Sequence, residues 1–190
     1  MKTIQLALAG VLLLGLPGLV SAQDKEEQSK EETERQEINA MAKGTLDRLF
    51  TESAGSKDLY DKAYGYAVFA GTQTALALAG GRGKGVAVDK ESGARTYMKV
   101  ASVGAGVGVG IQKLKTVFLF ETKERFDSFV EGGWEGDSTA GAAAGVDGAA
   151  AARSFTNGMT FYQLNDKGLI AQASVKGTKY SKNDKLNSGG

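Results

Sequence analysis

Glycine alternates with apolar residues near the middle of the chain. Between Ser102 and Gln112, glycine stands at positions 104, 106, 108 and 110, with Val, Ala or Ile between them. A period of two predicts a β-strand, because successive side chains point to opposite faces of a sheet. Glycine weakens a strand and packs no side chain, so the pattern indicates that another element or a ligand comes close to the bare face.

Other apolar runs predict strands separated by turn residues. The segments Lys90–Gly93 and Asn165–Gly168 are rich in turn-forming residues and predict hairpins. The glycine-rich segment Gly80–Gly85 predicts a turn or a bulge. Short connections favour antiparallel pairing, and the chain lacks the alternation of strand and helix that builds a parallel sheet. The expected strands are 66–70, 73–79, 86–89, 96–100, 116–120, 159–164 and 169–175.

Helical periodicity is clearest between Glu37 and Glu52. The apolar positions 38, 41, 46, 49 and 50 form one stripe, and Gly55 follows as a natural stop. Insertion of this stripe into a membrane surface is one interpretation. Packing on a sheet is favoured, because the polar face of the helix is not especially basic.

Two shorter helices are expected, at 57–63 and after Thr122. Thr122 resembles an N-cap, Phe126, Phe129 and Val130 share one face, and glycines 132 and 133 end the helix before Trp134 in a turn. The Ala/Gly segment 139–152 fits either a helix or tightly packed extended chain. The predicted fold class is α+β, with a strongly bent or barrel-like antiparallel sheet of short Gly-rich strands and two or three packed helices.

The first 22 residues have the features of a secretory signal peptide. Lys2 gives a basic start, Ile4–Val20 is apolar, and Val20-Ser21-Ala22 is a small-residue cleavage site. This predicts a periplasmic or secreted protein after cleavage between Ala22 and Gln23. The expected organisation is a signal peptide (1–22), a charged leader (23–37), a single domain (38–180) and a flexible tail (181–190).

The amino-acid composition excludes several kinds of catalytic and metal-binding site. The chain has no cysteine and no histidine, which removes thiolate catalysis, histidine acid–base catalysis and the common zinc sites. One of the 23 basic residues, Lys2, leaves with the signal peptide, so bases and the 22 acids balance. That balance does not support nucleic-acid binding. No cofactor or metal is expected.

Acidic and basic residues are unevenly distributed along the neutral chain. Residues 24–37 hold seven acids and three bases, so the remainder is weakly basic. Lysine recurs every third residue near the end, at 176, 179, 182 and 185. A basic body behind an acidic leader is consistent with an anionic surface as partner.

Catalytic and nucleotide-binding motifs are absent. Gly83-Lys84 is followed by Gly85 rather than Ser or Thr, so the Walker A pattern fails. Backbone amides together with Arg82 and Lys84 remain an alternative site for a lone phosphate, against a glycine-rich bulge with solvated bases. No G-x-S-x-G motif is present, so the chain is predicted not to be an enzyme.

Five blocks in order resemble the SYLF domain family. They are Ala63-Tyr-Gly-Tyr-Ala-Val-Phe69, Gly80-Gly-Arg-Gly-Lys-Gly-Val86, Gly108-Val-Gly-Ile-Gln112 leading into Thr116-Val-Phe-Leu-Phe120, the Ala/Gly stretch after Phe126 and Phe129, and Lys167-Gly-Leu-Ile-Ala-Gln-Ala-Ser-Val-Lys-Gly177. The resemblance covers roughly 59–180. It implies a lipid-binding domain of the kind also linked to actin-regulating proteins, with anionic lipids as ligands and no catalytic residues.

The leading hypothesis is therefore a non-enzymatic periplasmic protein that associates peripherally with anionic phospholipid head groups. In a bacterial envelope these would be phosphatidylglycerol or cardiolipin. The alternatives are a structural or protein-interaction module of the envelope, with an unknown protein partner, and a small hydrolase. The candidate head-group contacts are Arg82, Lys84, Lys113, Lys115, Lys176 and Lys179.

Overall fold

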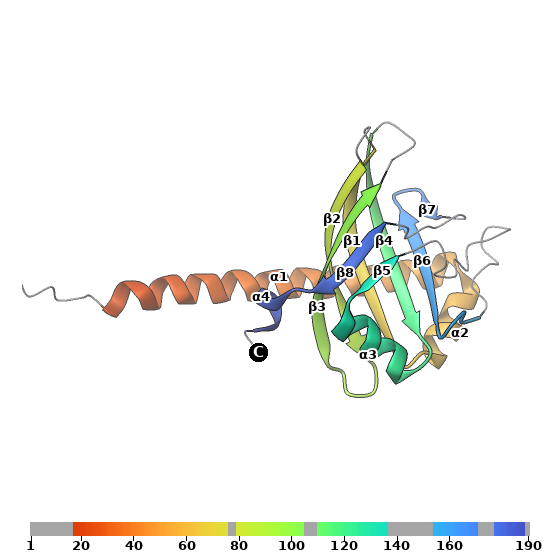
Figure 1. The fold of residues 1–190 in the computed structure, drawn as a ribbon, viewed down its shortest axis with the longest axis horizontal. Helices are drawn as coiled ribbons and strands as arrows, with labels where there is room; N and C mark the ends of the chain where they lie inside the picture. Colours follow the sequence, from red (N-terminus) through yellow and green to blue (C-terminus); the bar gives the residue numbers. More distant parts are fainter. Residues whose placement is uncertain (1–16, 76–78, 105–109, 137–153, 171–176, 189–190) are drawn as a thin grey trace, which may run out of the picture.

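The computed structural model describes residues 17–75, 79–104, 110–136, 154–170 and 177–188. Within them, an antiparallel sheet of eight strands curls into a half-barrel, with the long helix α1 on one face and α3 on the other (Figure 1). This arrangement confirms the predicted α+β class. The helices are α1 (Pro17–Glu52), α2 (Ala54–Lys62), α3 (Lys123–Gly132) and α4 (Asp184–Asn187). The strands are β1 (Gly65–Ala75), β2 (Ala79–Asp89), β3 (Arg95–Gly104), β4 (Gly110–Phe120), β5 (Trp134–Gly136), β6 (Met159–Asn165), β7 (Gly168–Leu169) and β8 (Thr178–Lys182).

The hairpin of β1 and β2 lies between β3 and β4. The strand order is β5-β8-β3-β2-β1-β4-β6-β7, so β4 returns beside β1 in the manner of a Greek key. Gly104 ends β3 opposite Ala79, whereas Gly110 begins β4 opposite Ala75. The expected single strand over 102–112 is therefore wrong, because its two ends belong to different strands. Its centre, 105–109, lies outside the described residues.

The segment Gly80–Gly85 is the interior of a strand. Predicting a turn there was wrong, because β2 runs unbroken from Ala79 to Asp89 between β1 and β3. The backbone amides of a strand with a neighbour on each side are engaged in the two ladders, so the phosphate-loop alternative fails as well. Strands β1 to β4 are also longer than the sequence suggested.

Helix α1 has two chemically different halves. From Ile38 onward, its apolar stripe packs on the sheet, with Ile38, Ala42, Leu46 and Leu49 all buried. The preceding residues, expected as a charged leader, continue the same helix back to Pro17. Pairs four residues apart, such as Lys30 with Glu26 at 2.8 Å, support this polar half. Helix α1 therefore begins well before the predicted Glu37 and ends at Glu52, as predicted.

The two faces of the sheet carry separate cores. On the α1 face, Val68, Val86 and Val117 pack under the apolar stripe of the helix. On the α3 face, Phe69, Phe118 and Tyr180 form an aromatic cluster with Phe129 of α3. Alternate residues of each strand thus belong to different cores, as the pleat of a strand requires.

Close contact between neighbouring strands explains two glycines of β2. A Cβ atom built on Gly85 would lie 2.2 Å from the carbonyl oxygen of Val68, and one built on Gly83 would lie 2.3 Å from that of Ala70. Such distances are far shorter than van der Waals contact. Both glycines belong to the α3 face, so this face is the crowded inside of the curl and the α1 face is its outside.

Local signals at element ends are confirmed with small differences. Thr122 caps α3 by accepting a hydrogen bond from the backbone N–H of Arg125, and Gly133 follows the helix with a φ of 68°. Trp134, expected in a turn, begins β5 and pairs with Tyr180.

The segment expected as a flexible tail contributes the end of β8 and helix α4, where Leu186 is buried. The Ala/Gly segment and most of the expected strand 169–175 lie outside the described residues.

Candidate functional site: a basic sheet face beside helix α1

Six basic residues from four strands share one face of the sheet. In one row across the sheet, Lys115 pairs with Ala70, Ala70 with Lys84, and Lys84 with Lys99. Directly paired residues of antiparallel strands point to the same face. A second row contains Lys113, Arg82 and Lys179, joined through Thr72 and Ala101. We call these six residues the basic face: Arg82, Lys84, Lys99, Lys113, Lys115 and Lys179.

The basic face continues the surface that α1 covers. Within β2, Arg82 and Lys84 point to the same face of the sheet as Val86 and Val88, which lie in the core under α1. On this face of β2, the apolar positions therefore end at Val86, and the basic positions Lys84 and Arg82 follow toward the start of the strand at Ala79. Because this face is the outside of the curl, its long side chains extend into solvent, and Arg82, Lys99, Lys113 and Lys179 are exposed.

A groove runs between α1 and these rows. Its volume is about 570 Å³, and its floor includes Ala70 and Thr72 of β1. Glu34 and Arg48 of α1 line one side. Five members of the basic face line the groove, namely Arg82, Lys84, Lys99, Lys113 and Lys115. Small side chains on the floor leave room for an anionic group among the long basic ones.

Lys84 differs from the rest of the basic face in having acidic partners. Its Nζ atom lies 3.2 Å from Glu34 Oε1 and 3.6 Å from Glu37 Oε2, both on α1. Across the described part of the chain, no ion pair involves the other five basic residues. Lys179 stands opposite Glu135 in the pairing of β8 with β5. Among the described residues that line the groove, six are basic and two, Glu34 and Asp166, are acidic, so positive charge is in excess there.

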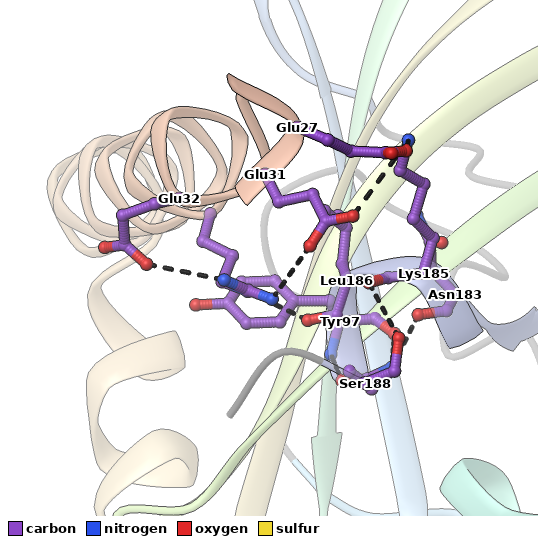
Figure 2. A network of polar contacts seen from close by, with 10 residues as sticks. Glu27, Glu31, Glu32, Tyr97, Asn183, Lys185, Leu186 and Ser188 are labelled. Atoms are coloured by element: carbon purple, nitrogen blue, oxygen red, sulfur yellow. Dashed lines mark hydrogen bonds and ion pairs between the residues drawn. The ribbon is translucent and has the colours of Figure 1, made fainter. Parts of the chain in front are cut away.

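A network between α1 and α4 fixes the helix beside the groove (Figure 2). Arg35 donates from Nε to the backbone oxygen of Leu186 at 2.9 Å and lies 3.5 Å from Glu31. Lys185 bonds Glu27 at 2.6 Å, which raises the pKa of Lys185 and lowers that of Glu27. Leu186 itself is buried in the core under α1. The polar half of α1 is therefore attached to the body on both sides of Glu34.

The structure brings together five of the six predicted contacts. Lys176 lies outside the described residues. Lys185 and Lys182, which belong to the basic repeat near the end of the chain, form ion pairs with Glu27 and Glu131 instead of joining the basic face. The repeat of lysines at every third position is therefore not one continuous surface.

Sequence reasoning missed Lys99, although a signal for it existed. The predicted turn Lys90–Gly93 sets the register of β2 against β3, and that register places Lys99 opposite Lys84. Arg48 was also missed as a residue at the edge of the groove, where it pairs with Glu52 at 2.5 Å. No sequence pattern shows which turn of α1 meets this edge.

Residues 101–189 match the family model described as "Ysc84: Las17-binding protein actin regulator". The matched region contains half of the basic face, including Lys113, Lys115 and Lys179. This part of the chain therefore matches the SYLF (Ysc84) family. The chain is also 43% identical over 143 residues to "Beta cell expansion factor A" of Aeromonas veronii, an alignment that covers 75% of this chain. The alignment spans 55% of that relative, so this chain corresponds to about half of its length.

Proposed function

We propose that this chain is a non-enzymatic lipid-binding protein that associates peripherally with anionic phospholipid head groups through its basic face. The observation that carries the proposal is the convergence of cations from β2, β3, β4 and β8 on the outside of the curl. The match of residues 101–189 to the SYLF (Ysc84) family supports a lipid-binding or actin-related module. None of the described helices is both long enough and apolar enough to cross a bilayer.

The charge of the basic face sets the expected strength of binding. Each Lys or Arg close to an anionic bilayer contributes about 1 kcal/mol, and the contribution falls off within a Debye length. Four contacts would contribute on the order of 4 kcal/mol, which corresponds to weak, salt-sensitive association. Phosphatidylglycerol and cardiolipin are the proposed ligands.

The proposed location is the periplasm or the exterior, after cleavage between Ala22 and Gln23. Cleavage there would remove the first residues of α1 and keep Glu27 and every later residue that contacts the body. The intact mass of the exported protein tests this location. A mass that includes residues 1–22 would contradict it.

Neutralising three of the exposed bases is expected to weaken membrane association strongly. The triple variant Arg82→Gln, Lys99→Gln and Lys113→Gln should weaken binding roughly 100-fold, because about 3 kcal/mol of attraction is lost. The measurement is co-flotation with liposomes of phosphatidylglycerol or cardiolipin, against pure phosphatidylcholine, at low and high salt. Binding should require the anionic lipid and should decrease at high salt.

A matched control separates the basic face from total charge. Lys57→Gln, Lys62→Gln and Lys123→Gln remove the same charge from α2 and α3, away from the groove. This control should float nearly as well as the unmodified protein. Equal flotation of both triple variants would contradict the proposed site. If the unmodified protein stays in the soluble fraction with every lipid at low salt, the lipid proposal fails in favour of an envelope interaction module.

A further inference from the structure

The most central cation of the groove is held by two carboxylates of the same chain. Lys84 lies in the row between Lys115 and Lys99 and contacts both Glu34 and Glu37. These two acids are three residues apart on α1 and so project from the same side of the helix. Two side-chain carboxylates thus stand where an anionic head group would approach Lys84.

The position of these carboxylates is set by anchors on both sides. Ile38, directly after Glu37, is 1% exposed in the core under α1. Arg35, directly after Glu34, is bonded to the backbone of Leu186 in α4. These two anchors hold the turn of α1 that carries Glu34 and Glu37 in place beside Lys84. The position of the two acids therefore does not depend on a flexible leader.

The contact is weak enough to be exchanged for a ligand. The side chains of Lys84, Glu34 and Glu37 are 44%, 40% and 66% exposed, so water and salt reach all three. Exposed ion pairs of this kind are easily broken. A phosphate that enters the groove can take the place of the carboxylates on Lys84, and the lost pairs then reduce its apparent affinity.

We propose that Glu34 and Glu37 form an autoinhibitory contact that competes with an anionic phospholipid head group for Lys84. This inference rests on the proposed function of the basic face. It assigns the acidic half of α1 a role as a competing anion built into the fold. Glu34 and Glu37 reduce the affinity of the groove for membranes, and their neutralisation increases it.

The test is a pair of matched double variants. Glu34→Gln with Glu37→Gln keeps the helical side-chain shape and should tighten binding to phosphatidylglycerol vesicles about 3- to 10-fold, the range expected for exposed ion pairs. Asp24→Asn with Glu26→Gln makes the same change in net charge on the same helix, away from the groove. This control should change binding less than about 2-fold, because distant exposed charges are screened.

A further Lys84→Gln substitution tests whether the effect passes through Lys84. In the unmodified protein it should weaken binding only slightly, whereas in the Glu34→Gln, Glu37→Gln background it should cancel the gain, a non-additive result in a double-mutant cycle. Equal gains for the two double variants, or a gain that survives Lys84→Gln, would overturn the autoinhibitory contact while binding itself stands. Absence of flotation for every variant would overturn the proposed function and this inference together.

Discussion

Gly85→Ala is expected to lower the free energy of unfolding by about 3 kcal/mol, the upper end of the range for overpacking a core. The added methyl group would lie 2.2 Å from the carbonyl oxygen of Val68 and 2.5 Å from Cδ1 of Phe69. The oxygen belongs to the backbone of β1, so the strand itself must move. Because the added methyl group would lie on the inside of the curl, the variant is also expected to flatten the sheet locally. Urea denaturation followed by circular dichroism measures the loss.

Gly44→Ala is the matched control for this substitution. Gly44 lies within α1, and a Cβ atom there meets nothing within 4 Å. Alanine is a better helix former than glycine, so this variant should be more stable by about 1 kcal/mol. If Gly85→Ala unfolds at the same urea concentration as the unmodified protein, the added methyl group does not overpack the contact between β1 and β2.

Phe118→Ala is expected to cost about 3–5 kcal/mol, as truncation of a buried phenylalanine does. The side chain is 0% exposed. Its ring lies between 5.0 and 6.3 Å, centroid to centroid, from six other aromatic rings. Removing it leaves a cavity between the sheet and α3 that the surrounding strands cannot close. Urea denaturation followed by circular dichroism again gives the change.

Trp134→Ala provides the comparison for Phe118. Trp134 contacts Phe118, Phe129 and Tyr180 but is only partly buried at the edge of the cluster. Its truncation should therefore cost clearly less than that of Phe118. Equal costs for the two variants would mean that Phe118 is not the centre of the aromatic core.

Both predictions bear on the candidate site. The α3 face and the α1 face belong to the same strands, so a substitution at Phe118 or Gly85 is expected to affect the sheet that carries the basic face. A variant that loosens the inside of the curl is expected to change the spacing of Arg82 and Lys99 on the outside. Membrane binding of folded variants should therefore be compared only after their stability is known.

The side-chain chemistry of single segments was sufficient to predict several helices and turns. The apolar stripe of α1 predicted which face of its second half packs on the sheet, because burying that stripe removes its apolar surface from water. Thr122 and Gly133 marked the ends of α3, because unpaired helix termini need a cap and a residue that accepts positive φ. The turn at 90–93 was also correct, with Gly93 at a φ of 75°.

Glycine was the main source of error. In isolation a run such as Gly80–Gly85 predicts a turn, because glycine lowers the stability of a strand. In the folded chain β1 and β3 lie on either side of this run, and the ladder with both neighbours compensates for that weakness. The alternating stretch 102–112 predicted a single strand. In the folded chain it contains the end of β3 and the start of β4, and the β1–β2 hairpin lies between these two strands.

The sequence by itself determined the α+β class, the resemblance to the SYLF family, the packing face of α1 and the basic character of positions 82, 84, 113, 115 and 179. Those properties follow from side-chain chemistry and from spacings within single elements. Only the tertiary structure decided that these bases, with Lys99, share one face, because strand register places side chains from four strands in common rows. It also decided that Lys84 meets Glu34 and Glu37, since a contact between residues some 50 positions apart depends on how α1 crosses the sheet.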